Sequence, residues 1–303
     1  MDLGIENVRQ RTSDHLISPM QYGAVVKPAS AHRDALGRER TCAIARLLLL
    51  GCGDAAAAEG FTIGGTGAAL GTMKLLANEF TTGNPGIPVT TVPGLDSSGG
   101  IKAVLDGVIG LAVTSRPIDG SERKLGAIEN EYARTPFAFA VSTESSVIEI
   151  TARELADIYV GRITAWADGS PVRVVLRRAT ERDTEMNKNI SPDMRRGVLA
   201  SEGRPGGRFS VTDQDAANDL EKIAGALGPS TLALIVSEKR ALRALKLAGK
   251  EPTPMNAASG ANRYYKRLFF VKGAKRPAAV ERFIAFVQSA GRKTIVSHGQ
   301  WIP

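Results

Sequence analysis

The 303-residue sequence is poor in the residues that build covalent or metal-based sites. Its two cysteines, Cys42 and Cys52, both lie before residue 60, so we expect no disulfide framework and no cysteine-based metal site in the rest of the chain. The three histidines, His15, His32 and His298, have no metal-ligand spacing. We therefore expect no metal and no cofactor, and a protein that is not an enzyme, because a nucleophile with its base or a metal cluster is missing.

Aromatic residues and long apolar runs are also scarce. Aromatics make up only 5% of the chain and are scattered, whereas a nucleic-acid surface would combine a basic stripe with interleaved aromatics. The net charge of +8, from 39 basic and 31 acidic residues, still favours anionic partners. No apolar run reaches the roughly 18–20 residues that span a bilayer. We expect a soluble globular protein that binds no nucleic acid, with one large domain or two of ordinary size.

The first 58 residues contain a signal-peptide-like segment. Arg38 and Arg40 precede the apolar residues 43–50, and four alanines follow at 55–58. A positive, then apolar, then small order is typical of a secretory signal, although Arg46 interrupts the apolar part. We expect residues 1–58 to be an N-terminal extension and the protein to be periplasmic or at the cell surface.

Two cleavage positions are possible in this segment. Leu49-Leu50-Gly51-Cys52 resembles a lipoprotein cleavage box, in which Cys52 would become the lipidated N-terminus. A peptidase cut after Ala58 is the alternative. A buried or interfacial helix of the mature protein is a third interpretation of the same residues.

From residue 61 onward, apolar strand-like runs alternate with helical patterns. Strands are expected at 61–63, 87–92 and 109–113, with helices at 68–81 and 99–107 between them. This alternation predicts a βαβ sheet with parallel strands and with loops gathered at its carboxyl edge.

The second half of the chain repeats the alternation with clear helix starts. Thr151 with Glu154 has the pattern of a capping box, and Ser191-Pro192 places proline directly after an N-cap residue. Further helices are expected from Thr212 to about Leu227 and from Pro277 onward. The expected strands are 137–141, 172–176, 232–236 and 268–271.

Four short clusters combine hydroxyls or arginine with small residues that leave backbone N–H groups accessible. At least three of them lie where a strand-like run is followed by a helix-like run, and this junction can hold an anion through free N–H donors and the helix dipole. The sequence therefore predicts a closed oxyanion site. The clusters are Gly64–Ala68, Asp96–Gly100, Thr114–Pro117 and Arg177–Thr184.

The clusters also have interpretations other than an oxyanion site. The run from Gly64 reads G-x-G-x-x-L with no strand-end acid at the usual distance, which disfavours a dinucleotide site, and it lacks the Gly-Lys-Ser/Thr of a P-loop. Ser97-Ser98 alone is often only an N-cap. Arg177 and Arg178 alternate on a strand, so only one of them can face the site.

Several of these motifs together resemble a known family. They are Gly65-Thr66-Gly67-Ala68, Ser97–Lys102, Ser115–Ile118, the segment Leu155–Trp166 with the following Val174–Arg178, and the C-terminal part of the chain from Arg267–Val271 to Gly299–Pro303. On these stretches, residues 61–303 resemble periplasmic phosphate-binding proteins, the solute receptors of bacterial phosphate ABC transporters.

The resemblance implies an α/β fold of the two-lobed periplasmic-binding-protein clamshell (type II), in which each lobe is a mixed sheet flanked by helices. Lobe one would comprise residues 59–137 plus 266–303, and lobe two residues 138–265. The ligand would be inorganic phosphate or a similar oxyanion held in the cleft. The implied partner is an ABC permease in the inner membrane, and the receptor itself would be a monomer.

The resemblance also implies the ligand-binding residues. Thr66 and the N–H groups of Gly67 and Ala68 would bind from lobe one, and Ser97 would bind at the start of the second helix. Arg178 would be the ion-pairing arginine, and Thr184 matches the threonine of the family's Ser-Gly-Thr turn. The remaining candidates adjoin these positions: Ser98, Ser115, Arg116, Arg182 and Asp183.

Two departures from the family pattern keep other ligands open. The Ser-Gly-Thr turn is replaced by Arg182-Asp183-Thr184, which loses the glycine that allows close backbone approach. Ser115 stands where some members have an aspartate that discriminates phosphate from sulfate, and Asp183 or Asp96 could substitute for it. Molybdate, sulfate or a small carboxylate are therefore alternative ligands, and a non-transport accessory or signalling protein is an alternative function.

Overall fold

The computed structural model describes residues 60–303. The expected signal-like segment and Cys52 lie outside the described residues. Within the described part, no helix is both long enough and apolar enough to cross a membrane.

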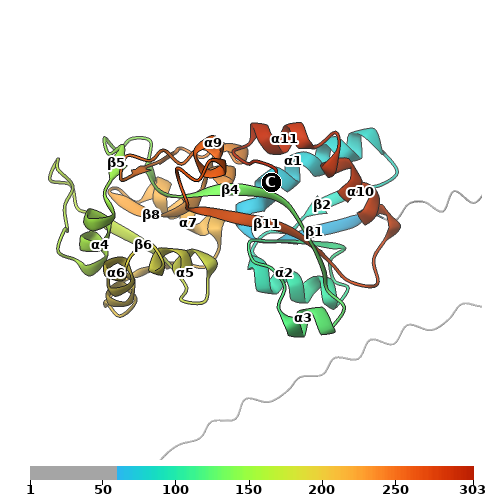
Figure 1. Ribbon diagram of the computed structural model, residues 1–303, viewed down its shortest axis with the longest axis horizontal. Helices are drawn as coiled ribbons and strands as arrows, with labels where there is room; N and C mark the ends of the chain where they lie inside the picture. The colour runs from blue at the N-terminus through green and yellow to red at the C-terminus, as the bar shows by residue number, and fades with distance from the viewer. Residues whose placement is uncertain (1–59) are drawn as a thin grey trace, which may run out of the picture. The chain divides into compact units, whose positions relative to one another are not determined.

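The described chain is a mixed α/β fold of two lobes (Figure 1). One sheet runs through both lobes in the order β2-β1-β3-β11-β4-β8-β6-β7, with β9 added on β4. Strands β1, β2 and β3 pair in parallel, as do β6, β7 and β8, whereas β4 and β11 run antiparallel to their neighbours. The bounds of these strands are β1 Phe61–Gly65, β2 Val89–Thr91, β3 Leu111–Thr114, β4 Ile128–Ser142, β6 Arg173–Arg177, β7 Arg208–Ser210, β8 Ala226–Thr231, β9 Leu242–Ala244 and β11 Tyr265–Lys272.

The long strand β4 connects the two lobes. Its first part pairs with β11 as far as Pro136, and its second part pairs with β8 from Phe137 onward. In Figure 1 the two long strands β4 and β11 run side by side between the lobes. A small separate sheet pairs β5 (Glu149–Ile150) with β10 (Lys246–Leu247).

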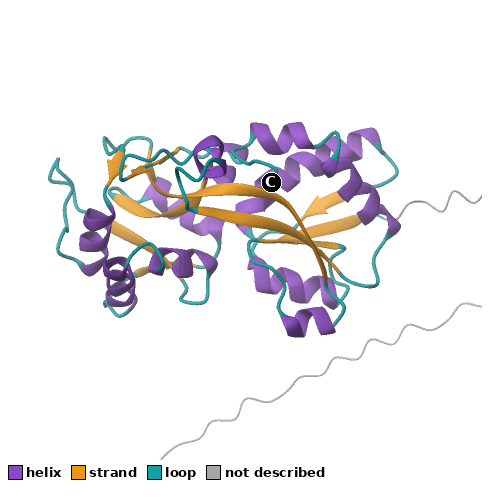
Figure 2. Cartoon of the chain, viewed as in Figure 1, coloured by secondary structure: helices purple, strands orange, loops and turns teal. Residues whose placement is uncertain are grey.

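Lobe one packs helices on both faces of its sheet (Figure 2). Alternate strand residues point to opposite faces, so Val113 packs with Leu70 and Phe283 while Ala112 packs with Ile101. One face is covered by α1, α10 and α11, and the other by α2. The helices of this lobe are α1 Gly67–Gly83, α2 Asp96–Leu105, α3 Gly120–Lys124, α10 Ala278–Gln288 and α11 Arg292–Ser297.

Lobe two repeats this three-layer arrangement. Leu176 packs on one face with residues of α4 and α6, and Val175 packs on the other with residues of α7 and α8. The capping box of Thr151 with Glu154 and the Ser191-Pro192 start are both present as predicted. The helices are α4 Ala152–Val160, α5 Arg182–Lys188, α6 Pro192–Glu202, α7 Asp213–Lys222, α8 Leu232–Ser237 and α9 Pro254–Ala258.

The predicted strand at 232–236 is wrong. These residues form helix α8, which is capped by the Thr231 hydroxyl accepting from the Leu234 N–H, and the strand is β8 just before it. A short apolar run has no periodicity that separates a buried helix from a buried strand, and Gly228-Pro229 within β8 lacks strand propensity. The helix expected to reach Leu227 ends at Lys222, because Gly225 turns the chain into β8.

Candidate functional site

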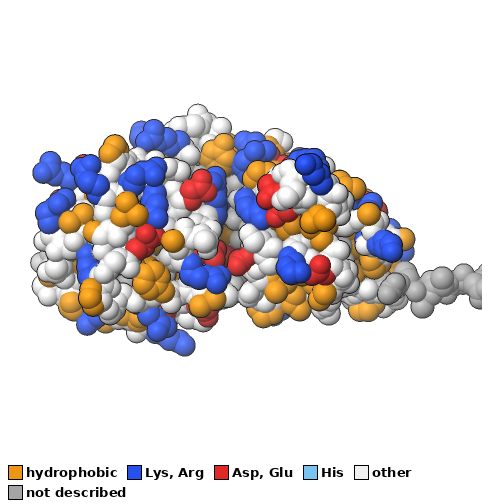
Figure 3. Space-filling model, turned by 90° about the horizontal axis from the view of Figure 1, so that it is seen from below, with side chains coloured by type: hydrophobic (Ala, Val, Ile, Leu, Met, Phe, Trp, Pro, Cys, Tyr) orange, Lys and Arg blue, Asp and Glu red, His pale blue; other side chains and the backbone are white. Residues whose placement is uncertain are grey.

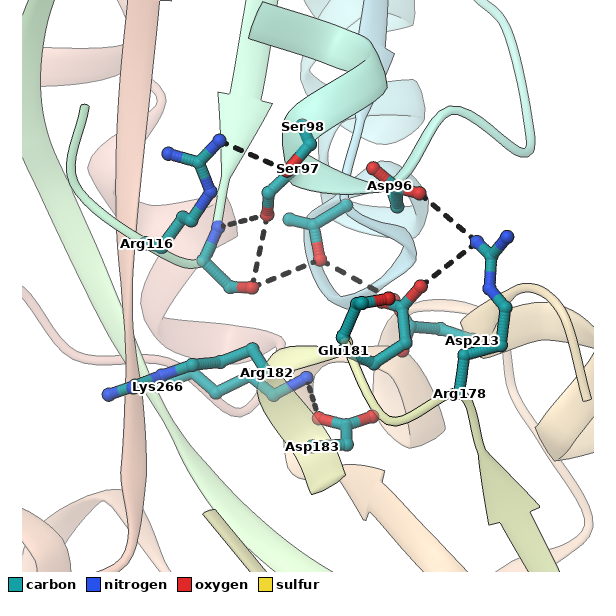
Figure 4. Close-up of a pocket in the computed structure, with 13 residues that line it drawn as sticks. Asp96, Ser97, Ser98, Arg116, Arg178, Glu181, Arg182, Asp183, Asp213 and Lys266 are labelled. Atoms are coloured by element: carbon teal, nitrogen blue, oxygen red, sulfur yellow. Dashed lines mark hydrogen bonds and ion pairs between the residues drawn. The ribbon is translucent and has the colours of Figure 1, made fainter. Parts of the chain in front are cut away.

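A cavity of about 260 Å³ lies between the lobes. Its lobe-one wall is formed where α1 and α2 begin and where β3 ends. Its lobe-two wall comes from the loop between β6 and α5, from the first two residues of α5 and from the first residue of α7, and β11 adds Lys266. The cavity therefore collects residues from segments far apart in the sequence, as the close-up in Figure 4 shows.

Three hydroxyl groups form the polar wall of lobe one. Thr66 is the N-cap residue of α1, Ser97 lies in the first turn of α2, and Ser115 follows β3. The Ser97 Oγ accepts from the Ser115 N–H at 3.0 Å, and the Ser115 Oγ lies 3.3 Å from Ser97 Oγ and 3.5 Å from Thr66 Oγ1. The structure brings these three predicted residues together at one edge of the sheet.

Ser98 and Arg116 also line the cavity. The Arg116 guanidinium donates to Ser98 Oγ at 3.0 Å and to both carboxylate oxygens of Glu122 at 2.7 and 2.9 Å. Glu122 completes the capping box of α3, which holds it in place beside Arg116. The bidentate contact engages most of the planar donor set of Arg116.

Arg177, the last residue of β6, and Arg178, which directly follows it, have different surroundings. Arg178 lines the cavity, is 48% exposed, and pairs with Asp96 of lobe one at 3.2 Å and with Glu181 at 3.0 Å. Arg177 is 2% exposed and points into lobe two, where it donates to the Ser210 carbonyl at 2.9 Å. Strand alternation accounts for this division.

Residues 182–184 do not all lie in the cavity wall. Arg182 and Asp183 line the cavity, and Arg182 pairs with Glu185 at 2.6 Å. Asp183 is buried and forms an ion pair with Lys266. Thr184 is outside the cavity lining formed by the described residues, because its hydroxyl donates to the Arg177 carbonyl at 3.1 Å.

The backbone N–H groups expected to bind the anion are also outside that lining. Gly67 and Ala68 are buried at the start of α1. The Ala68 N–H donates to Asp213 Oδ2 at 3.0 Å, and the Thr66 hydroxyl lies 3.4 Å from the same oxygen. A carboxylate of lobe two thus occupies the N-terminus of α1.

Asp213 and Lys266 are cavity residues that sequence reasoning missed. Thr180 and Glu181 also line the cavity; they lie within the predicted cluster Arg177–Thr184 but were not named as ligand-binding candidates. The pair Thr212 and Asp215 predicts the helix start that contains Asp213, but no sequence signal indicates that its carboxylate reaches α1. Lys266 lies just before the expected strand 268–271 and belongs to none of the motifs. The lining holds four carboxylates and four cations, and within residues 60–303 each of these cations has a carboxylate partner.

The acidic groups of the cavity differ in their pKa. Burial raises the pKa of Asp183, and the neighbouring Asp213 carboxylate adds to this effect against the opposing Lys266 and Arg177. Burial would also raise the pKa of Asp213, but Lys266 and Arg177 outweigh it and hold that pKa below its usual value. Burial, aided by the charge of Asp96, raises the pKa of Glu181. Asp213 is therefore a stable carboxylate in the cavity wall.

This arrangement is suited to binding. No group of three or more His, Cys, Asp or Glu in the described part of the chain is placed to hold a metal ion. On the face shown in Figure 3, basic side chains are dispersed over both lobes with acidic ones among them. Hydroxyls and guanidinium groups around a cavity can recognise a small polar ligand by hydrogen bonds and charge.

Solved structures of binding proteins share this fold. A substrate-binding protein with bound phosphate from Clostridium perfringens matches with a TM-score of 0.66 and 21% identity, covering 81% of this chain and 99% of that chain. An ABC-type phosphate transport receptor from Vibrio cholerae matches with a TM-score of 0.54 and 22% identity, covering 80% and 99%. A periplasmic molybdate-binding protein from Azotobacter vinelandii matches with a TM-score of 0.57 and 15% identity, over 80% and 99%.

Sequence comparison finds a shorter match. The phosphate-binding protein PstS 2 of Streptococcus agalactiae serotype V, and its serotype III counterpart, are 30% identical over 73 residues, which is 24% of this chain. The match spans about a quarter of the length of these curated relatives. The family model described as the PBP superfamily domain matches residues 52–290, well over half of the chain. The chain therefore belongs to the PBP superfamily.

Proposed function

We propose that this chain is the solute-binding receptor of an ABC-type importer and that the cavity between its lobes binds phosphate. The observation that carries this proposal is the convergence of Thr66, Ser97 and Ser115 from lobe one with Arg178 from lobe two on one cavity of about 260 Å³. Neutral hydroxyls with a guanidinium are the donors that a tetrahedral oxyanion needs.

The energetics are consistent with reversible binding. Charge-assisted hydrogen bonds contribute roughly 1.5–3 kcal/mol each, and association costs about 4–15 kcal/mol. Several converging donors therefore suffice for micromolar binding. The relatives support phosphate as the ligand, because the Clostridium perfringens structure holds phosphate and the Streptococcus agalactiae proteins are named for binding it.

A second candidate ligand is another oxyanion, such as molybdate or sulfate. The Azotobacter vinelandii protein with this fold binds molybdate by its name. The cavity lining also contains four carboxylates, one of which is Asp183, so this site differs chemically from one built only of neutral donors. A non-transport accessory or signalling role remains the alternative if no anion binds.

The role of a receptor implies a location and partners. We infer export through the signal-like segment within residues 1–58, with lipidation of Cys52 as the anchored form. The partner would be an ABC permease of the inner membrane, and the receptor would act as a monomer without catalytic activity. Intact-mass measurement of the mature protein tests cleavage and lipidation.

The test of the ligand is calorimetric titration of the purified protein with phosphate, sulfate and molybdate. We expect phosphate to bind with the highest affinity. Ser97→Ala should weaken phosphate binding by roughly tenfold, because it removes a hydroxyl from the lobe-one wall. Ser259→Ala is the matched control, since Ser259 is exposed and outside the cavity.

Two results would overturn the phosphate assignment. One is the lack of both heat and thermal shift at millimolar phosphate, which would favour the accessory role. The other is a higher affinity for molybdate or sulfate than for phosphate, which would change the ligand and leave the receptor function in place.

A further inference from the structure

We propose that Asp213 is an intramolecular counter-anion of this site: its carboxylate occupies donors at the N-terminus of α1, and the ligand binds by displacing it. This inference rests on the proposed function, because it concerns how an anion gains access to the same cavity. Asp213 lies outside the donor set that the sequence analysis assigned.

The carboxylate reaches from one lobe to the other. Asp213 is the first residue of α7 in lobe two, yet its Oδ2 accepts from the Ala68 N–H of lobe one at 3.0 Å and lies 3.4 Å from Thr66 Oγ1. In Figure 4 it lies beneath the hydroxyl cluster, on the side of the cavity formed by lobe two. These contacts place a full negative charge at the helix terminus.

Helix α1 provides no such charge of its own. Its N-cap residue Thr66 makes no side-chain capping hydrogen bond within the described residues, and its first turn contains no acidic residue. The free N–H groups and the helix dipole therefore attract an anion from elsewhere. Asp213 supplies that anion from lobe two.

Gly67 makes the close approach possible. A Cβ added at Gly67 would lie 2.6 Å from the Asp213 Cβ and 2.8 Å from its Oδ2. The adjacent Gln214 donates through Nε2 to the Gly67 carbonyl at 3.2 Å, which adds a second contact between the lobes beside the carboxylate. Any larger residue at 67 would push Asp213 away from α1.

Asp213 is held in this position from behind. Its Oδ1 lies 3.4 Å from the Arg177 guanidinium, and the side chain is 13% exposed. Lys266 is the second cation whose charge acts on it. Because these cations keep Asp213 ionised, a dianion entering the cavity meets a like charge as well as occupied donors.

If Asp213 competes with the ligand in this way, its negative charge should lower the affinity for phosphate. Asp213→Asn keeps the side-chain oxygen that accepts from Ala68 but removes the charge. We expect its affinity for phosphate to rise at least about tenfold, because a repulsion at close range in a partly enclosed site is lost. Asp193→Asn is the matched control, since Asp193 is also a first-turn acid, on α6, and is outside the cavity lining.

The experiment is calorimetric titration of wild type, Asp213→Asn and Asp193→Asn with inorganic phosphate, with the Ala68 amide followed by ¹⁵N–¹H NMR. The proposal predicts tighter binding by Asp213→Asn alone. It also predicts that the Ala68 resonance shifts in wild type on adding phosphate and starts from a different position in Asp213→Asn. Thermal unfolding of each variant verifies that it is folded.

The outcomes separate this inference from the proposed function. If wild type binds phosphate and Asp213→Asn binds it equally or more weakly, the counter-anion role is overturned and the receptor function stands. The counter-anion role is also overturned if phosphate binds without moving the Ala68 resonance. If neither protein binds phosphate, both proposals fail together.

Discussion

Lys266 and Asp183 form an ion pair in the protein interior, with 2% and 4% of their side chains exposed. The pair links the crossing strand β11 to the first turn of α5, and Arg177 Nε lies 3.7 Å from the same carboxylate. Asp183 also lines the cavity between the lobes. The buried cation therefore compensates a carboxylate charge in the cavity wall.

Replacing Lys266 tests this compensation. Lys266→Met should lower the free energy of unfolding by about 3–5 kcal/mol, because it leaves the buried Asp183 without its closest cation. The double variant Lys266→Met/Asp183→Asn should recover most of the loss. Urea denaturation measures both, with Lys102→Met as the control, since the exposed Lys102–Asp106 pair should contribute less than about 1 kcal/mol.

Equal losses in Lys266→Met and Lys102→Met would contradict this account. So would a double variant no more stable than Lys266→Met, because the cost would then come from packing and not from an uncompensated carboxylate.

Arg177 and Arg178 should have separate effects, the first on stability and the second on ligand binding. Arg177→Met removes a buried cation that lies near Asp183 and Asp213, so we expect a loss of about 3–5 kcal/mol in the free energy of unfolding. Arg178→Met removes a half-exposed cation of the cavity and should change stability by less than about 1 kcal/mol. Its phosphate affinity should fall by roughly ten- to a hundredfold.

Urea denaturation and phosphate calorimetry on both variants provide the comparison. Arg153→Met is the control, because Arg153 is 90% exposed on α4. If Arg178→Met binds phosphate like wild type, the ion-pairing role of Arg178 is wrong.

Local sequence signals predicted much of the fold. Glu154 three residues after Thr151 and proline after Ser191 mark real helix starts, because capping is decided within one turn of chain. The alternation of strand and helix patterns similarly predicted the parallel strands β1, β2 and β3, but it did not indicate the antiparallel strands β4 and β11. The short apolar run 232–236 was mispredicted because tertiary packing, and not periodicity, decides its conformation.

The candidate site was less accessible to sequence reasoning. Thr66, Ser97 and Ser115 follow strands that pair side by side, so the sheet itself brings them together. Asp213 and Lys266 reach the cavity through the approach of two lobes and a crossing strand. No local motif encodes such a long-range ion pair.

Replacing Gly65 with alanine should lower the stability of the protein. Its φ is +132°, which side chains rarely adopt, and an added Cβ would lie 1.9 Å from the Val113 carbonyl oxygen. That oxygen accepts from the Thr66 N–H at 2.8 Å, so the clash would also displace a cavity residue. We expect Gly65→Ala to lose roughly 3 kcal/mol or more of stability in denaturant unfolding.

Gly83 provides the comparison for Gly65. It is the last residue of α1, and among the described residues no atom would lie within 4 Å of an added Cβ. Gly83→Ala should therefore be neutral or stabilising by up to about 1 kcal/mol. Similar unfolding curves for the two variants would contradict the strained role of Gly65.

Asp219 should stabilise lobe two at neutral pH and lose this effect in acid. Hydrogen bonding from Arg208, joined by the Ser210 hydroxyl, holds the pKa of Asp219 below its usual value despite partial burial. Because the folded pKa is lower than the unfolded value, this stabilisation is present above the unfolded pKa and is lost as pH falls through the folded pKa. Asp219→Asn should thus be less stable than wild type at neutral pH, and the difference should shrink in acid. Urea unfolding of both proteins over a pH series measures this difference in stability. A difference that stays constant with pH would show that Asp219 acts through packing or neutral hydrogen bonds instead.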